Sequence, residues 1–338
     1  MKILAIGDMH FKDNQSYADY IEDGRVSEKK EVLDFIVASA SDCDHVVLLG
    51  DNFNSKNNSS ETNRAFVEFI ERFGSKQTYI ISGNHEKKGN GKTAIDFLGE
   101  IHNPNWHIFT RPGTVTVGKT RLDFLPFMLA SELGVETPEE ASAVMLEGMT
   151  GGGILFTHHA ITGTTFNGIK TDTLREPVLS KVKFEKKYEM IVAGHIHVPQ
   201  QYGKVLITGS VFTSEVGETE KYIWKIETDD MTVEKLTVPQ RGIVKLTDPT
   251  EEELDDLPSN WIVKTIVTNK KTNVADLKFL LSRFHASLII EDYPDERKKV
   301  AIEKDAAFDF SIEALLKLYS EAKGVELEKL LAGLQLIS

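Results

Sequence analysis

The chain has 338 residues, of which 41% are hydrophobic and 27% are charged, and its formal net charge is −13. This composition excludes a disordered, collagen-like or coiled-coil chain, and no apolar run approaches the ~18 residues that would span a bilayer. The acidity argues against a protein that holds duplex DNA through its own surface alone. The length predicts two domains, or one large domain with an appendage.

The N-terminus and the cysteine content bear on the compartment. The apolar stretch Ile3–Ile6 is too short for the core of a signal peptide, and the one cysteine, Cys43, permits no intrachain disulfide. We therefore expect a cytoplasmic protein. Asp42 and Asp44 flank Cys43 and disfavour its thiolate, so we expect this cysteine to be structural.

Short apolar runs predict strands up to about residue 240, and amphipathic stretches predict helices. Helices are expected over Ser27–Ala40, with Ser27 as the N-cap, and over Glu61–Phe73. Residues 114–127 predict a hairpin, and residues 201–238 predict further strands. Alternating strands and helices indicate an α/β fold with helices outside a sheet. Five strands each end in a polar cluster, namely Lys2–Ile6, His45–Leu49, Thr78–Ile81, Ile154–Thr157 and Met190–Ala193.

The pattern changes after residue 240. Asp248–Pro258 is acidic and flanked by proline, which predicts a linker or an exposed turn. Trp261–Thr268, Val274–Arg283 and Ala286–Ile290 then predict a compact βαβ unit, and Ser311–Ile337 predicts two short amphipathic helices. We predict a core over residues 1–240, a small cap over 241–300 and a helical tail over 301–338.

Carboxylate, imidazole and amide side chains follow the five strands: Asp8, His10, Asp51, Asn84, His158, His195 and His197. These donors suit Mn²⁺, Fe²⁺ or Zn²⁺, and the lack of a cysteine ligand argues against structural zinc. Seven ligands are too many for one ion and fit two. One ligand must then bridge, and Asp51, central in chain order, is the natural candidate. Two ions about 4 Å apart can clamp a phosphate for in-line attack.

The other histidines differ in what they predict. His85 follows Asn84 directly and would lie over the phosphate, where a protonated imidazole could stabilise the transition state or protonate the leaving oxygen. His159 should point away from the site if its strand continues, so we expect it to support a ligand. Surface or core positions are expected for His45, His102, His107 and His285.

The motifs GDMH, GDN, GNHE, FTHH and GHIH, in this order, resemble those of the calcineurin-like metallophosphoesterases. The resemblance implies an α/β (α+β) fold, built as a two-layer β-sandwich flanked by helices, with a dinuclear metal site. It assigns one ion to Asp8, His10, Asp51 and His197. It assigns the other ion to Asp51, Asn84, His158 and His195. His85 would be the catalytic histidine.

A finer resemblance is to the Mre11/SbcD nucleases, above all the short phage recombination-endonuclease subunits. It rests on the early first motif, on Thr208-Gly209-Ser210 followed by Glu215 and Gly217, and on the order of core, cap and tail. It implies an Mn²⁺-dependent nuclease of DNA repair and recombination, with Mg²⁺, Fe²⁺ or Zn²⁺ as alternatives. The expected actions are 3′-to-5′ exonuclease on duplex ends and endonuclease on single strands. A phage-encoded chain would work in the host cytoplasm.

The same resemblance implies partners besides DNA. The helical tail would dock an SMC-like ATPase of the Rad50 or SbcC type, and its Leu-rich helices fit helix-groove binding. The alternative is that these helices pack on the protein's own core. A homodimer would form through core helices, here Ser27–Ala40 or Glu61–Phe73.

Two positions depart from the family pattern, and two other functions stay open. Asn54 replaces an acidic residue or histidine, and Glu86 replaces aspartate; both are expected to orient ligands and tune the metal. One rival is a metallophosphatase or phosphodiesterase acting on small molecules or phosphoproteins, against which the cap and tail count. The other is a non-catalytic scaffold for an ATPase, against which the complete ligand set counts.

Overall fold

The computed structural model describes residues 1–20, 24–89, 91–166, 169–171, 174–218, 220–284, 286–292 and 320. Contacts divide the chain into two compact units, Met1–Tyr293 and Pro294–Ser338. Every element below belongs to the first unit. Apart from Ser320, the predicted tail helices over Ser311–Ile337 lie outside the described residues, and so does His285. The domain boundaries at 240 and 300 stay predictions.

The first sheet has six strands in the order β16-β15-β1-β2-β3-β6. Its strands β1, β2, β3 and β6 are parallel, whereas β15 is antiparallel to β1 and β16 to β15. The bounds are β1 Lys2–Ile6, β2 His45–Leu48, β3 Gln77–Ile81, β6 Trp106–Phe109, β15 Tyr222–Glu227 and β16 Thr232–Thr237.

The second sheet also has six strands, in the order β13-β14-β12-β9-β8-β7. The four central strands are parallel, and the two edge strands are antiparallel to their neighbours. The bounds are β7 Gly113–Val117, β8 Thr120–Leu125, β9 Ile154–Thr157, β12 Met190–Ala193, β13 Gln200–Tyr202 and β14 Val205–Ile207. The β7–β8 pair confirms the hairpin predicted over residues 114–127.

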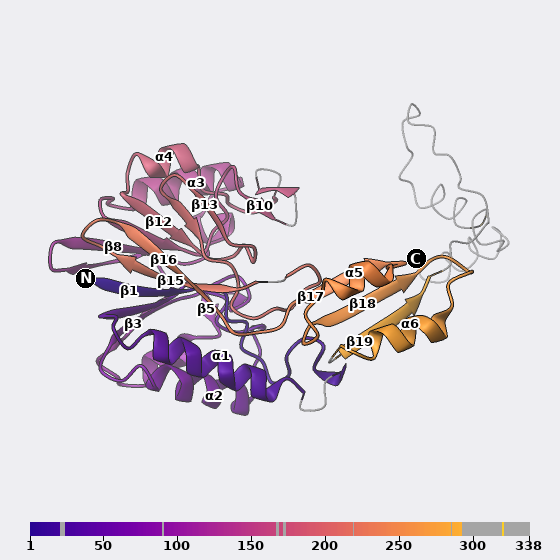
Figure 1. The fold of residues 1–338 in the computed structure, drawn as a ribbon. Helices are drawn as coiled ribbons and strands as arrows, with labels where there is room; N and C mark the ends of the chain where they lie inside the picture. The colour runs from indigo at the N-terminus through magenta and orange to yellow at the C-terminus, as the bar shows by residue number, and fades with distance from the viewer. Residues whose placement is uncertain are drawn as a thin grey trace, which may run out of the picture. The chain divides into compact units, whose positions relative to one another are not determined.

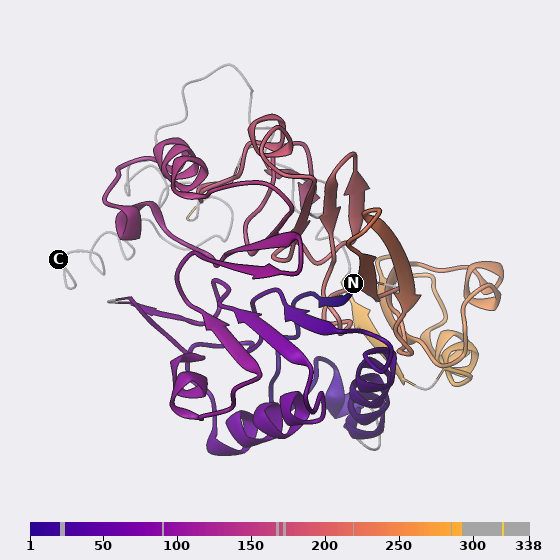
Figure 2. The same cartoon turned by 90° about the vertical axis from the view of Figure 1, so that its left-hand side faces the viewer.

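The two sheets pack face to face over a core that both contribute to. Ile3 and Val47 of the first sheet and Phe124, Phe156 and Val192 of the second are all fully buried in this core. Helices α1 and α2 cover the outer face of the first sheet, and α3 and α4 cover that of the second (Figure 1). Figure 2 shows the same layers from a perpendicular direction. The α/β fold, a two-layer sandwich flanked by helices, is therefore as predicted.

The two helices on the first sheet follow the predicted spans closely. α1 runs over Val26–Ser39 and α2 over Ser60–Glu71. Ser59 caps α2 by accepting a hydrogen bond from the Thr62 N–H. The prediction that Ser27 caps α1 was wrong, because Arg25 occupies the N-cap position with a left-handed φ of 61° and no side-chain cap. The Arg25 guanidinium is fully buried and donates to Glu28 and to the Thr213 carbonyl, which holds the residue in that conformation.

The remaining core elements are short. They are α3 Pro138–Gly148, α4 Lys181–Glu185, the 3₁₀ helices Ala18–Tyr20, Asp96–Glu100 and Ala130–Leu133, and the two-stranded pairs β4 Lys87–Gly89 with β5 Lys92–Thr93 and β10 Thr165–Phe166 with β11 Ile169–Lys170. In the part of the chain that the structure describes, no helix is long and apolar enough to cross a membrane.

A third, smaller sheet follows the core. Its three parallel strands are β17 Ile243–Thr247, β18 Ile262–Val267 and β19 Ala286–Glu291, and its crossover helices are α5 Glu251–Asp255 and α6 Val274–Leu281. The βαβ unit is thus confirmed, but the linker predicted over Asp248–Pro258 was wrong. Thr250 and Glu253 form a capping box that starts α5, and Leu254 is buried against α6 and β18. With Leu254 as its one buried residue, this acidic stretch has too little hydrophobic periodicity to predict a helix.

Candidate metal centre

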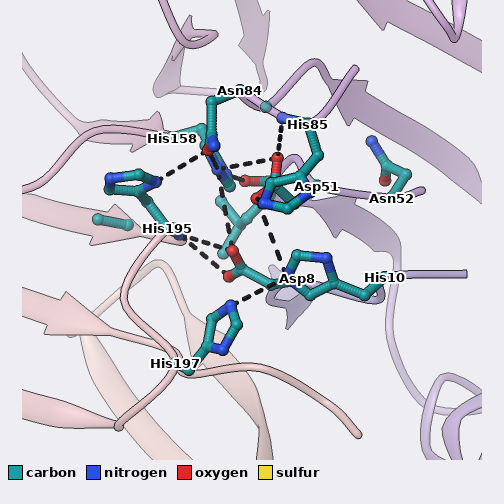
Figure 3. Close-up of polar contacts among 12 residues, drawn as sticks. Asp8, His10, Asp51, Asn52, Asn84, His85, His158, His195 and His197 are labelled. Atoms are coloured by element: carbon teal, nitrogen blue, oxygen red, sulfur yellow. Dashed lines mark hydrogen bonds and ion pairs between the residues drawn. The ribbon is translucent and has the colours of Figure 1, made fainter. Parts of the chain in front are cut away.

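The candidate site lies where strands from both large sheets end (Figure 3). The loops after β1, β2, β3, β9 and β12 supply Asp8, His10, Asp51, Asn84, His158, His195 and His197. These loops converge because parallel strands carry their carboxyl ends to the same edge of a sheet. All seven predicted side chains are thereby brought together. Their role as ligands stays a prediction.

The backbone at this end is held in unusual conformations. His10, Asp51 and His195 have φ angles of 44°, 43° and 76°, in the left-handed region that costs non-glycine residues energy. Hydrogen bonds hold them there: the His10 N–H donates to the Asp51 carbonyl at 2.8 Å, and the His195 N–H donates to Asp8 Oδ1 at 2.9 Å. At Gly83 a Cβ would lie 2.1 Å from Asp51 Oδ1, so only glycine lets these loops approach.

One group of donors contains Asp8, His10 and His197, whose candidate ligand atoms all lie within 4.8 Å of one another. The Nε2 atoms of His10 and His197 are 2.9 Å apart. Two imidazole nitrogens and a carboxylate aimed at one point are a typical half of a divalent-metal site.

A second group contains Asp51, His158 and His195, again with ligand atoms within 4.8 Å. Asn84 joins it, because its Oδ1 lies 3.1 Å from His158 Nε2 and 3.0 Å from His195 Nδ1. This group unites two loops of the second sheet with two of the first.

Asp51 lies between the two groups, because it also forms a set of close candidate ligand atoms with His10 and His85. Its Oδ1 lies 3.3 Å from His158 Nε2, and its Oδ2 lies 3.9 Å from His10 Nε2. A carboxylate that presents one oxygen to each group is placed as a bridging ligand would be. The bridging role of Asp51 stays a prediction.

The two carboxylates of the site have histidines as their only ion-pair partners within the described residues. Asp8 and Asp51 are buried, and neither forms an ion pair with lysine or arginine within the described residues. Burial tends to lower the pKa of His158, but the neighbouring Asp51 carboxylate outweighs it and raises that pKa to about 10. Burial lowers the pKa of His10 to about 4. Buried carboxylates need compensating cations, so the donor set fits two divalent ions.

Bound there, such ions would supply Lewis acidity toward a phosphate group. The chain's own contribution is to fix the donors. Asn52, buried beside Asp51, donates from Nδ2 to the Ile81 carbonyl at 2.9 Å and so ties the loop after β2 to the end of β3.

His85 differs from the buried donors in that its side chain is 41% exposed, although its candidate ligand atom lies within 4.8 Å of those of His10 and Asp51. Its N–H donates to Asp51 Oδ1 at 2.9 Å, and its Nδ1 lies 2.9 Å from the Asn54 carbonyl. Because a carbonyl only accepts, Nδ1 carries a proton and Nε2 is the free ring nitrogen. His85 lines a cavity of about 330 Å³ together with His10, Asp51 and Asn84. It is therefore placed to meet a substrate.

The two departures from the family pattern now have structural explanations. Glu86 is fully buried, and its two oxygens accept from the Phe53 N–H at 2.7 Å and the Gly83 N–H at 2.5 Å. It thereby fastens the loop after β2 to the loop after β3. Asn54 is exposed and contacts His85 through its backbone carbonyl. Its side-chain identity is therefore of little consequence for that contact.

Two carboxylates behind the donors were not predicted. Glu176 Oε1 lies 2.5 Å from His195 Nε2, and Glu218 Oε1 lies 3.5 Å from His197 Nδ1. Such partners fix the ring orientation of a metal-binding histidine. Glu218 also pairs with the buried Lys221 at 2.8 Å. No local pattern marks Glu176, whereas Glu218 directly follows the Glu215 and Gly217 positions already noted.

Among the described residues, the remaining histidines lie at the surface or in the core, as the sequence suggested. His159 is buried; its Nε2 accepts from the Met128 N–H at 3.2 Å, and its ring stacks on Phe127, which also contacts His195. His45 and His107 pack against Tyr79. Burial, followed by the charge of Asp42, raises the pKa of Cys43 to about 11, in keeping with a structural cysteine.

Comparison with known proteins identifies the class. The model of the calcineurin-like phosphoesterase family matches residues 1–199, which is more than half of the chain. No curated protein matches. One similar solved structure is an archaeal phosphodiesterase, with 12% sequence identity and a TM-score of 0.36; the match covers 70% of this chain and 99% of that one. Another is a metallophosphoesterase from Sphaerobacter thermophilus, with 14% identity and a TM-score of 0.34; the match covers 71% of this chain and 90% of that one. A Vps29 mutant from Entamoeba histolytica is also similar, with 10% sequence identity and a TM-score of 0.31; the match covers 70% of this chain and 99% of that one.

The fold and the site are those of a phosphoester-hydrolysing metalloprotein. The chain belongs to the calcineurin-like phosphoesterase family. It is a metal-dependent phosphoesterase, and the clustered histidines and aspartates are the groups available to hold the divalent ions that the family uses.

Proposed function

We propose that this phosphoesterase is an Mn²⁺-dependent DNA nuclease of the Mre11/SbcD type. The observation that carries the proposal is that the seven candidate metal donors occur together with a further sheet, β17-β18-β19, next to the site. The base of that sheet, Ile243 and Ile262, packs against Tyr17 and Val216. The neighbours of these two residues, Ser16 and Glu215, line the site cavity. A phosphatase of small molecules has no need of such an appendage.

In this proposal each side chain has a defined task. The seven donors would hold the ions, with Asp51 as the donor between the two groups. His85 acts on the substrate: it lines the cavity, and in the protonated form it donates from Nε2 to the phosphate or to the leaving oxygen. The Asn54 carbonyl accepts from Nδ1–H and so holds the orientation of the ring. The mixture of imidazole and oxygen donors suits Mn²⁺, with Mg²⁺, Fe²⁺ or Zn²⁺ as alternatives.

The proposal extends to partners. DNA is the substrate, and the tail over residues 301–338 docks an SMC-like ATPase of the Rad50 or SbcC type. A homodimer forms through α1 and α2. Support for the dimer comes from a cavity of about 290 Å³ between these helices, lined by Phe11, Val26, Leu33 and Phe69 among others. Val26 is 67% exposed there. The single cysteine suits a reducing cytoplasm, which for a phage-encoded chain is that of the host.

The test is cleavage of an end-labelled linear DNA duplex in Mn²⁺. We expect progressive loss of label with the parent and at most a trace with His85→Asn. Calorimetric titration with Mn²⁺ should give two equivalents for both proteins. The matched control is His102→Asn, at an exposed histidine outside the site, which should cleave like the parent.

Two results would contradict the proposal. Hydrolysis of small phosphodiesters without cleavage of DNA, by a parent that binds two Mn²⁺, would favour the small-molecule phosphodiesterase. Failure to bind two equivalents of Mn²⁺ would favour the scaffold. If the ATPase partner restores DNA cleavage in the first case, the nuclease proposal stands in its two-subunit form.

A further inference from the structure

One side of the site cavity is not formed by metal donors. Besides His10, Asp51, Asn84 and His85, the cavity of about 330 Å³ is lined by Lys12, Ser16, Asn54, His195, His197, Ser214 and Glu215. Neither the family pattern nor the donor scheme assigns Lys12 and Ser16 a task. They come from the segment that follows the first metal motif.

Lys12 is a half-buried cation without an anionic partner. Its Nζ donates to Ser16 Oγ at 3.0 Å, and it forms no ion pair within the described residues. Glu215, the other acidic lining residue besides Asp51, is exposed and does not pair with it. A desolvated ammonium group of this kind gains most from an anion that enters the cavity.

The segment is also held rigidly. Lys29 Nζ donates to the Lys12 carbonyl at 2.8 Å, and its ammonium lies 4.2 Å from the centre of the Phe11 ring. Arg25, fully buried, donates from Nη1 to the Ser16 carbonyl at 2.7 Å. Two cations on the α1 side thus anchor the backbone at Lys12 and at Ser16. Such anchoring fixes the ammonium and the hydroxyl before a ligand arrives, which lowers the cost of binding.

We propose that Lys12 and Ser16 form a subsite for a second phosphate group of the substrate, next to the phosphate that is hydrolysed. The ammonium is a point charge suited to phosphate oxygens. Ser16 Oγ already accepts from Lys12, so its own proton is free to donate to a phosphate oxygen. The chemical class that presents two neighbouring phosphates is a polynucleotide strand. The inference rests on the nuclease proposal. It explains why the enzyme would prefer a polynucleotide strand to an isolated phosphodiester.

The test compares three dinucleotides with the same scissile bond. Thymidylyl-thymidine has one phosphate, and its two phosphorylated forms carry an additional phosphate at the 5′ or the 3′ end. The measured quantity is the ratio of kcat/KM for a phosphorylated form to that for the unphosphorylated one. We expect the parent ratio to be tenfold or more for one of the two forms, which also identifies the side of the scissile bond that Lys12 faces.

Lys12→Met should lower that ratio about tenfold, whereas Lys12→Arg should keep most of it. The matched control is Lys30→Met, at a lysine whose side chain is 79% exposed on α1, which should keep the parent ratio. Hydrolysis of bis(p-nitrophenyl) phosphate checks that each variant is folded and loaded with Mn²⁺.

The outcomes separate the two proposals. A parent that hydrolyses bis(p-nitrophenyl) phosphate but cleaves neither DNA nor any dinucleotide, even with the ATPase partner added, refutes the nuclease. A parent that cleaves DNA but treats all three dinucleotides alike refutes the second-phosphate subsite. A parent preference that survives in Lys12→Met refutes the assignment to Lys12.

Discussion

Replacement of Glu86 by alanine is expected to destabilise the protein by about 2–6 kcal/mol. The side chain is fully buried and accepts two hydrogen bonds, from the N–H groups of Phe53 and Gly83. Alanine leaves both N–H groups buried without an acceptor, and each such loss costs about 1–3 kcal/mol. Water cannot take over a site that has no access to solvent, unless the loops separate.

Glu86→Gln provides the internal comparison. Glutamine keeps one carbonyl oxygen, so it can retain one of the two hydrogen bonds, but its amide NH₂ faces the other N–H donor. We expect about half of the alanine effect or less. If the loss of stability came from the removal of side-chain volume, Glu86→Gln would be as stable as the parent. If it comes from the loss of the two hydrogen-bond acceptors, stability should fall from the parent to Glu86→Gln and further to Glu86→Ala.

The assay is urea unfolding followed by tryptophan fluorescence, in EDTA so that metal binding does not contribute. The matched control is Glu147→Ala, at an exposed glutamate of α3, which should stay within about 0.5 kcal/mol of the parent. A loss below 1 kcal/mol for Glu86→Ala, or equal losses for both Glu86 variants, would refute the view that this side chain fastens the two loops by its two oxygens.

Two further predictions concern the metals. Glu176→Gln should weaken one of two bound Mn²⁺ by roughly 10–100-fold, since Glu176 orients His195, and Glu218→Gln should weaken the other through His197; calorimetric titrations that showed both equivalents unchanged would contradict this. Removal of metal with EDTA should lower the thermal midpoint, and free Mn²⁺ at a thousandfold above its Kd should restore about 4 kcal/mol for each ion that binds; an unchanged midpoint would mean that the folded state does not bind the ions preferentially.

The clustering of the candidate metal donors could be predicted from the sequence because its signals are local. Each motif directly follows a short apolar strand, so the position of the strand fixes the position of the side chain. Asp8 and His195 illustrate this, since both follow strands whose carboxyl ends share one edge of their sheets. What the sequence left open is the contact between them, in which the His195 N–H donates to Asp8 Oδ1 across 187 residues.

Elements that depend on distant contacts were the ones missed. Arg25 ends up at the N-cap of α1 because its guanidinium is buried against Glu28 and the Thr213 carbonyl, 188 residues further along the chain. No N-cap preference favours arginine. Glu176 is likewise recognisable only once the fold brings it to His195. Helix α5 depends on one buried leucine, Leu254.

The two departures from the family pattern show why residue identity alone ranks positions poorly. Asn54 contacts His85 through a carbonyl that any residue would supply, so a change there leaves that contact intact. Glu86 contacts two N–H groups with its side chain, so a change there alters the joint between two metal-bearing loops. Glutamate in place of aspartate at position 86 is the more conservative of the two replacements, yet it has the larger structural consequence.

The formal charge of −13 appears at odds with a polyanionic substrate, and the site geometry resolves the conflict for the proposed function. Binding through the whole surface would require a basic face and many phosphate contacts. With two divalent ions held on the buried carboxylates, and the Lys12 ammonium beside them, the site would instead concentrate positive charge where two phosphates of a strand would lie. Local charge within a partly desolvated cavity acts more strongly than the same charge spread over exposed surface. An acidic chain can therefore select a nucleic-acid strand at its site while its general surface repels the duplex.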